Sequence, residues 1–139
     1  MPQNSDLAQI NNLILNYGFY VDRCDHDAVA NLWLEEGEYI VKGVGHWVGH
    51  AQLKEMVKSE LHQEYVSNGC VHFMGPPSII VEETNAQAKS NTLLIKCTSE
   101  GFAIDRVFEN TWHFRKTAAG WKILLRENTL LSPKNNTAT

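Results

Sequence analysis

Residues 16–33, NYGFYVDRCDHDAVANLW, contain the point where one helical pattern ends and a second begins. Upstream, apolar residues recur at steps of three and four, which predicts an amphipathic helix over residues 6–23. Downstream, Asp25 stands one residue before a second such pattern, so its carboxylate can accept hydrogen bonds from the first turn, and Asp27 favours the helix dipole. Asp22 has no such structural role, because it comes three residues too early to cap the second helix.

The rest of the chain predicts one further helix and a run of strands. EYIVKG and HWVG flank a glycine-containing turn at residues 43–45 and predict a hairpin, and AQLKEMVKSELHQEY predicts a third helix. From Cys70 onward the apolar period shifts toward two. We therefore expect an α+β fold, with helices on one face of a curved, mostly antiparallel sheet. The later strands are expected over residues 71–82, 86–98, 102–116 and 120–131, before a frayed tail from about residue 132.

Length and composition limit the possible classes of protein. The chain has 139 residues and is 43% apolar, which predicts a single domain over residues 1–139. Its net charge of -4, with 12 basic and 16 acidic residues mixed along the chain, offers no basic stripe for nucleic acid. No apolar run approaches the length of a membrane helix, and the first residues lack the pattern of a signal peptide. We expect a soluble cytoplasmic protein with no nucleic acid or membrane partner.

The cysteines and histidines predict no metal site. Cys24, Cys70 and Cys97 are odd in number and lack metal-ligand spacing, so they are interpreted as small buried hydrophobic residues. The histidines form no HxxxH or similar motif. From spacing alone, no metal is expected.

Strict alternation along the last two strands places polar groups on faces that should be buried. In residues 102–116, Arg106 and Asn110 share a face with apolar residues, so Arg106 either reaches a carboxylate, extends to an edge or lines a wet pocket. In residues 120–131, the same rule sets Trp121 and Ile123 opposite Arg126. Arg126 could bind an anionic or carbonyl oxygen, or pair with a glutamate. The apolar residues expected on the face of Arg106 are Phe102, Ile104, Phe108, Trp112 and Phe114.

His72, in CVHFMGPP, is a candidate general base. A histidine near its unperturbed pKa can take up and release a proton at neutral pH, and a carboxylate on its other ring nitrogen would fix the tautomer. Asp22 is the candidate for that carboxylate. Tyr17 lies five positions before Asp22, about 140° around the helix, so the two side chains could flank a pocket. The alternatives are a hydrogen-bonded structural histidine, a solvated helix end and a core tyrosine.

Four blocks carry a resemblance to the SnoaL-like family of the nuclear transport factor 2-like superfamily. They are INNLILNYGFYVDRCDHDAVANLW, YIVKGVGHWVGHAQL, VHFMGPPSIIVEE and FENTWHFRKTAAGWKILLRE, which together span nearly the whole chain. The resemblance implies a cone-shaped, cystatin-like fold with three helices on a strongly curved sheet. In enzymes of the family, an aspartate and a histidine form a dyad inside the cone, at positions matching Asp22 and His72. Tyr17 and Arg126 match a tyrosine and an arginine of its dehydratases, whereas its dehydrochlorinases have a lysine in place of the tyrosine.

The resemblance implies a cofactor-independent lyase of the dehydratase type that acts on a hydrophobic small molecule. His72 would remove a carbon-bound proton, with Asp22, Tyr17 and Arg126 assisting, before water is eliminated. An isomerase, a polyketide cyclase and a noncatalytic ligand-binding module are the alternatives. A homo-oligomer is expected, with a trimer favoured over a dimer. The predicted substrate-binding residues are Arg106, Asn110, Phe19, Trp47, Phe108 and Trp112.

Overall fold

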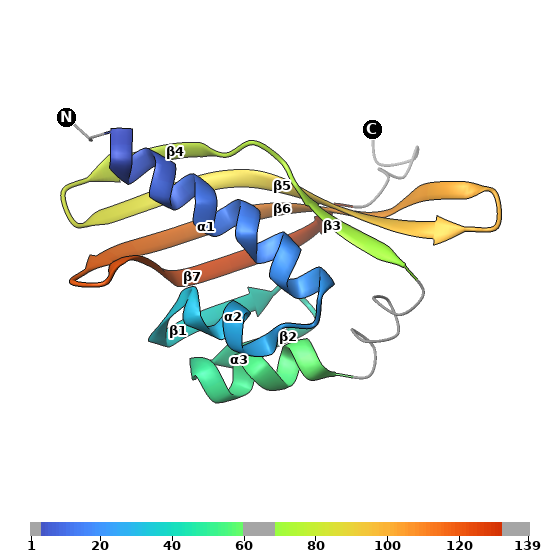
Figure 1. The fold of residues 1–139 in the computed structure, drawn as a ribbon, viewed down its shortest axis with the longest axis horizontal. Helices are drawn as coiled ribbons and strands as arrows, with labels where there is room; N and C mark the ends of the chain where they lie inside the picture. Colours follow the sequence, from blue (N-terminus) through green and yellow to red (C-terminus); the bar gives the residue numbers. More distant parts are fainter. Residues whose placement is uncertain (1–3, 60–68, 132–139) are drawn as a thin grey trace.

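The computed structural model describes residues 4–59 and 69–131 of the chain (Figure 1). None of the helices in these two ranges has the length and hydropathy of a membrane-spanning segment. The helices are α1 (Asn4–Asp22), α2 (His26–Asn31) and α3 (Gly49–Lys58), and the strands are β1 (Trp33–Val41), β2 (Gly45–Val48), β3 (Cys70–Met74), β4 (Ser78–Glu82), β5 (Asn85–Thr98), β6 (Gly101–Thr117) and β7 (Gly120–Leu131).

Within the described residues, the seven strands form one mixed sheet in the order β2-β1-β7-β6-β5-β3, and β4 also pairs with β5. Only the β1–β7 pairing is parallel among these strand pairs. The predicted α+β class is confirmed, and the expected strand 71–82 is divided into β3 and β4 by Gly75-Pro76-Pro77. The predicted third helix is described only as far as Lys58, and its last residues, like the predicted frayed tail, lie outside the described ranges.

Helix α1 lies across the sheet (Figure 1) and buries its apolar stripe against it. Gly18 makes the closest approach: a Cβ atom there would lie 2.6 Å from the backbone oxygen of His72 and 2.8 Å from Met74 Cγ. Only glycine therefore permits this packing, which sets the last turn of α1 beside β3. The buried stripe consists of Ile10, Ile14, Tyr17 and Val21.

Polar contacts fix the start of α1 and the start of α2. At the first turn, the buried Asp6 carboxylate accepts hydrogen bonds from Lys116 Nζ and Trp121 Nε1, both at 3.0 Å. After the last turn, Asp25 caps α2 by accepting a hydrogen bond from the backbone N–H of Ala28 at 3.1 Å, as the sequence predicts. These contacts leave Asp22 as the last residue of α1, free of any capping role.

The alternation predicted for residues 102–116 is wrong before Arg106. Leu94 pairs with Arg106, but the next residue, Ile95, pairs with Ile104, so Asp105 is an extra residue in β6. This β-bulge reverses the faces of all residues that precede it. Phe102 and Ile104 therefore lie on the face opposite Phe108, Trp112 and Phe114, and they are 76% and 60% exposed.

A second bulge corrects the prediction for the last strand. His113 pairs with Leu125 while Phe114 pairs with Ile123, which leaves Leu124 as the extra residue. Because the faces reverse at Leu124, Arg126 does not oppose Trp121 and Ile123 but shares their buried face. The guanidinium of Arg126 consequently points into the protein under the helices.

Candidate active site

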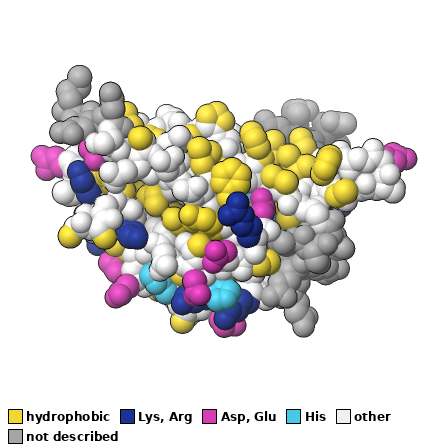
Figure 2. Space-filling view, viewed as in Figure 1, with side chains coloured by type: hydrophobic (Ala, Val, Ile, Leu, Met, Phe, Trp, Pro, Cys, Tyr) yellow, Lys and Arg dark blue, Asp and Glu magenta, His cyan; other side chains and the backbone are white. Residues whose placement is uncertain are grey.

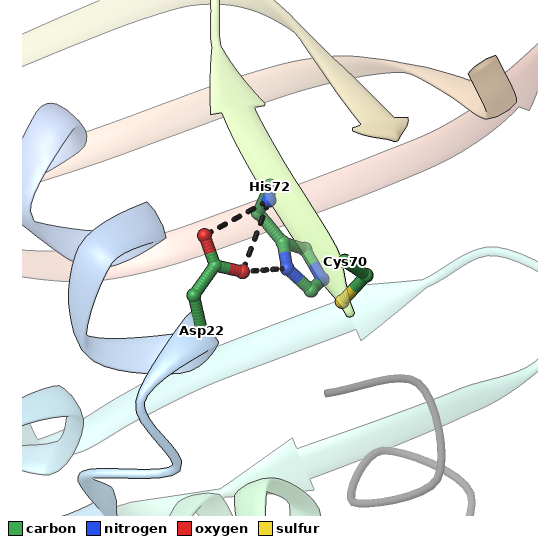
Figure 3. Close-up of side chains that lie close together, drawn as sticks. All are labelled: Asp22, Cys70 and His72. Atoms are coloured by element: carbon green, nitrogen blue, oxygen red, sulfur yellow. Dashed lines mark hydrogen bonds and ion pairs between the residues drawn. The ribbon is translucent and has the colours of Figure 1, made fainter. Parts of the chain in front are cut away.

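The Asp22 carboxylate and the His72 side chain form a close pair (Figure 3). Asp22 Oδ1 lies 2.6 Å from His72 Nδ1, and both carboxylate oxygens accept the backbone N–H of His72, at 3.0 and 3.1 Å. The two side chains are 19% and 22% exposed, so the pair is accessible while most of it is desolvated. With Nδ1–H donating to the carboxylate, Nε2 is the nitrogen whose lone pair can accept a proton.

The local sequence explains why this pair forms. Asp22 ends α1, and the glycine contact at residue 18 brings that end against β3. In β3, His72 pairs with Leu94 of β5 and faces the helix-covered side of the sheet, like buried Met74 two residues later. The backbone hydrogen bonds to Asp22 lock the carboxylate, so the imidazole meets a preorganised acceptor.

A buried arginine lies deeper on the same face. Arg126 is 3% exposed, and its guanidinium carbon lies 4.6, 5.0 and 4.4 Å from the ring centroids of Tyr17, Tyr39 and Trp112. Among the described residues it makes no ion pair with a carboxylate. Burying a charge without an ion-pair partner costs free energy. The cation–π contacts with the three aromatic rings compensate for only part of that cost.

The Arg126 guanidinium also joins a chain of buried hydrogen bonds. Its NH2 group donates to Thr92 Oγ1 at 3.3 Å, and Thr92 Oγ1 lies 2.6 Å from Asn110 Oδ1. Asn110 donates in turn to Asn128 Oδ1 at 2.7 Å, and Asn128 donates to the hydroxyl of Tyr39 at 2.7 Å. This chain fixes the arginine side chain and uses both ends of the Asn110 amide.

Two donors beside this chain are unpaired. The Tyr17 hydroxyl and Arg126 Nε are both buried, and neither has a hydrogen-bond partner within the described ranges. Burial raises the pKa of Tyr17 well above its usual range, although the charge of Arg126 opposes the rise. Tyr17 therefore remains protonated at neutral pH and keeps its hydroxyl as a hydrogen-bond donor. Two unpaired donor groups and a positive charge therefore lie together in the buried interior of this face.

The strand register connects the arginine to the dyad. In the sheet, Arg126 pairs with Trp112 on β6, and Trp112 pairs with Ala88 on β5. The guanidinium of Arg126 nevertheless reaches Thr92, which lies four residues beyond Ala88 along β5, in the direction of Leu94. Leu94 is the residue that pairs with His72. The Arg126 side chain thus extends along the sheet toward the end that carries the dyad.

The other predicted site residues are divided between this face and the solvent. Trp112 is fully buried beneath Arg126, and Trp47 is half-buried against Tyr39, with ring centroids 5.6 Å apart. Phe108 is half-buried on the same face, opposite Thr92 in the register. These positions follow from the alternation of β2 and of β6 after its bulge.

Two of the predicted site residues lie away from both the Asp22–His72 pair and the buried residues around Arg126. Phe19 is 58% exposed, because two positions along a helix turn it about 200° away from buried Tyr17. Arg106 lies in the cross-strand row of His72, separated from it by Leu94, and its exposed side chain pairs with Asp105 at 3.4 Å. Folding therefore brings together Asp22 with His72, and Tyr17 with Arg126, Asn110 and Trp112.

Some residues of the site were not predicted from the sequence. Cys70 lies beside the dyad, and burial followed by the charge of Asp22 raises the pKa of its thiol to about 11. Thr92, Tyr39 and Asn128 complete the buried chain. One available signal was the alternation of small and polar residues at positions 86, 88, 90 and 92 of β5, which marks a face with polar contacts.

Comparison with known protein families assigns the chain to one family. The model of the SnoaL-like domain matches residues 3–127, which is most of the sequence. The chain belongs to the SnoaL-like family. A comparison with curated proteins found no match.

Solved structures place this SnoaL-like chain in the cystatin-like fold. An NTF2-like protein with a cystatin-like fold from Novosphingobium aromaticivorans is 37% identical, with a TM-score of 0.90 over 94% of this chain and 84% of that one. The LinA-type3 hexachlorocyclohexane dehydrochlorinase from Novosphingobium barchaimii is 16% identical, with a TM-score of 0.79 over 92% and 88%. A Mycobacterium tuberculosis protein of unknown function is 19% identical, with a TM-score of 0.81 over 96% and 75%. Proteins that share this fold thus include an enzyme and a protein of unknown function.

Proposed function

We propose that this SnoaL-like protein is a cofactor-independent lyase of the dehydratase type, acting on a hydrophobic small molecule. The observation that carries the proposal is the 2.6 Å contact between Asp22 Oδ1 and His72 Nδ1, at a place that is partly open to solvent. A carboxylate on Nδ1 orients the imidazole and stabilises its protonated form. We also propose that the three helices and the strongly curved sheet enclose a cone-shaped interior, as the resemblance implies.

The proposed reaction begins with removal of a carbon-bound proton by His72 Nε2. The substrate proton is acidified by an adjacent carbonyl, and the electron pair of the broken C–H bond delocalises onto the carbonyl oxygen. The electrons then form a carbon–carbon double bond as the bond to a β-hydroxyl breaks, and the proton held by His72 leaves with that hydroxyl as water. No oxidant or reductant is needed.

Arg126 and Tyr17 are the proposed stabilisers of the negative charge on the carbonyl oxygen. The guanidinium is buried without a carboxylate partner in the described part of the chain, and the Tyr17 hydroxyl is an unpaired donor. Preorganised donors in a desolvated place are worth more than the same groups in water. Asn110 uses its amide within the protein, so we assign it to positioning Thr92 and Arg126.

The chemical character of the surface supports an apolar substrate. Figure 2 shows hydrophobic side chains gathered over the β3 end of the sheet, whereas charged side chains and histidines lie mostly along the α2 and α3 side. Trp47, Phe108 and Trp112 add aromatic area to the helix-covered face. Few polar anchors within apolar walls are typical of small-molecule sites.

A screen of apolar β-hydroxy ketones and β-hydroxy thioesters tests the proposed function. We expect at least one alicyclic or aromatic compound to lose water in the presence of the protein, with mass spectrometry identifying the unsaturated product. A product of unchanged mass would instead indicate an isomerase or a cyclase. Tight binding with no change in any compound of the panel would contradict the lyase proposal and favour a ligand-binding module.

We also propose that the protein is a homo-oligomer, with a trimer favoured over a dimer, and that it assembles through the uncovered face of the sheet. The register places apolar side chains in two cross-strand rows on the face opposite the helices. Several are strongly exposed, which is unusual for a monomer. The rows are Val71, Ile95 and Ile104, and Phe73, Leu93, Val107 and Leu131.

The variant Ile104→Glu is expected to reduce the oligomer to a smaller species, because it places a charge at the β6 end of the apolar row that contains Val71 and Ile95. The molar mass is measured by size-exclusion chromatography with light scattering. Lys89→Glu is the matched control, since Lys89 is exposed on the same face of β5 but outside these rows. A wild-type monomer, or equal masses for the wild type and Ile104→Glu, would contradict assembly through this surface.

A further inference from the structure

The dyad has a third neighbour that the proposed reaction does not use. Cys70 and His72 are two residues apart on β3, so their side chains lie on the same face, and α1 brings Asp22 to them (Figure 3). One potential ligand atom from each of the three residues lies within 4.8 Å of the other two. The cluster does not correspond to any sequence motif, because Asp22 comes from a different part of the chain than Cys70 and His72.

The three donor groups are chemically suited to zinc. Carboxylate oxygen, thiolate sulfur and imidazole nitrogen are its usual protein ligands, and a tetrahedral ion holds them about 3.3 to 3.6 Å apart. The three donor atoms lie within 4.8 Å of one another, so they must move closer together to reach that spacing when an ion binds. A thiolate and a carboxylate together balance two positive charges, so the occupied cluster would carry no net charge.

The carboxylate is already held in place for such a role. Both oxygens of Asp22 accept the backbone N–H of His72, which limits its rotation toward solvent. Two cations lie near the cluster in the register: Lys96 pairs directly with Cys70, and Arg106 lies beyond Leu94 in the cross-strand row of His72. Asp105 forms ion pairs with both, at 3.0 Å with Lys96 and at 3.4 Å with Arg106, so both charges are partly neutralised.

We propose that Asp22, Cys70 and His72 bind a thiophilic divalent cation such as Zn²⁺, and that this binding inactivates the dyad. If the ion binds His72 Nδ1, it replaces the hydrogen shared with Asp22, because the 2.6 Å contact is too short for two ligands of one ion. If it binds Nε2, it occupies the lone pair that accepts the substrate proton. In either geometry His72 ceases to be a base.

Cobalt binding to the full-length reduced protein tests the inference without any substrate. A thiolate bound to Co²⁺ gives a charge-transfer band in the near ultraviolet, and tetrahedral coordination gives intense visible bands. We expect both for the wild type, and we expect equimolar Zn²⁺ to remove them. In Cys70→Ser and Cys70→Ala the thiolate band should vanish, and the affinity for Zn²⁺ should fall about tenfold or more.

Cys97→Ser is the matched control, because Cys97 is exposed and lies outside the cluster. It should bind both metals as the wild type does, and circular dichroism establishes that each variant is folded. A wild type without the thiolate band, or a band that persists in folded Cys70→Ser and Cys70→Ala, would overturn the proposed site. Because the readout is metal binding, these outcomes are independent of whether the proposed dehydration is correct.

Discussion

Replacement of His72 by alanine is expected to lower kcat/KM for dehydration by about two to four orders of magnitude, the usual contribution of a positioned general base. The variant removes the imidazole that contacts Asp22 at 2.6 Å but keeps the backbone N–H that the carboxylate also accepts. The fold should therefore persist while proton removal is lost. Steady-state kinetics on a substrate from the screen measures the effect.

His46→Ala is the control for this variant. His46 is an exposed histidine on β2 that lies 3.7 Å from Glu38, far from the dyad in the sheet order. Its removal should leave kcat/KM within about twofold of the wild type, as for a surface substitution away from the site. Equal losses in His46→Ala and His72→Ala, or full activity in folded His72→Ala, would show that His72 is not the base.

The variant Arg126→Met is expected to lower kcat by about two to three orders of magnitude without reducing the free energy of unfolding. The rate falls because the oxygen that develops negative charge loses its main electrostatic partner. Stability is retained because burial of a lone guanidinium costs several kcal/mol, while its contacts with three aromatic rings return about 2 kcal/mol. Methionine fills the same space without charge. Kinetics and urea denaturation measure the two effects.

Arg115→Met supplies the comparison for the buried arginine. Arg115 is also on the sheet, but it is exposed and pairs with Glu36 at 3.3 Å, so its removal should change both quantities little. A fall in stability of several kcal/mol in Arg126→Met with unchanged kcat would assign Arg126 to structure. A fall in kcat with stability preserved is the signature of a group retained for function.

The helical part of the fold was accessible from sequence because its signals are local. The predicted helix over residues 6–23 is observed at Asn4–Asp22, and the predicted cap Asp25 accepts a first-turn hydrogen bond. Periodicity and capping depend on residues within a few positions of one another. Asp22 was singled out by the same reasoning, as the aspartate left over when capping had been assigned.

The faces of the long strands could not be predicted in the same way. Each β-bulge inserts one residue, and its position depends on the partner strand rather than on the local pattern. The bulge at Leu124 turned Arg126 inward, and the bulge at Asp105 turned Phe102 and Ile104 outward. Both corrections concern function, because the first creates the buried cation and the second contributes to the apolar outer rows.

The candidate site was predicted only as far as the resemblance and single residues could indicate. Asp22 and His72 are 50 positions apart, and their contact depends on the packing of α1 at Gly18 against β3. The buried chain through Thr92 and Asn128 was beyond prediction, because polar residues on an inner face are identified only when the register is known. Cys70 gave no signal as a ligand, since its partner Asp22 lies on another element.

Deuterium exchange at the carbon next to the carbonyl is the most direct test of the central claim, that Asp22-oriented His72 removes a carbon-bound proton. A substrate from the screen is incubated in D₂O with wild-type protein or His72→Ala, and the C–H signal is followed by proton NMR. The account predicts loss of this signal with wild-type protein, in recovered substrate or product, and none above background with His72→Ala. Turnover by wild-type protein that leaves this C–H bond intact, or equal exchange with His72→Ala, would contradict it.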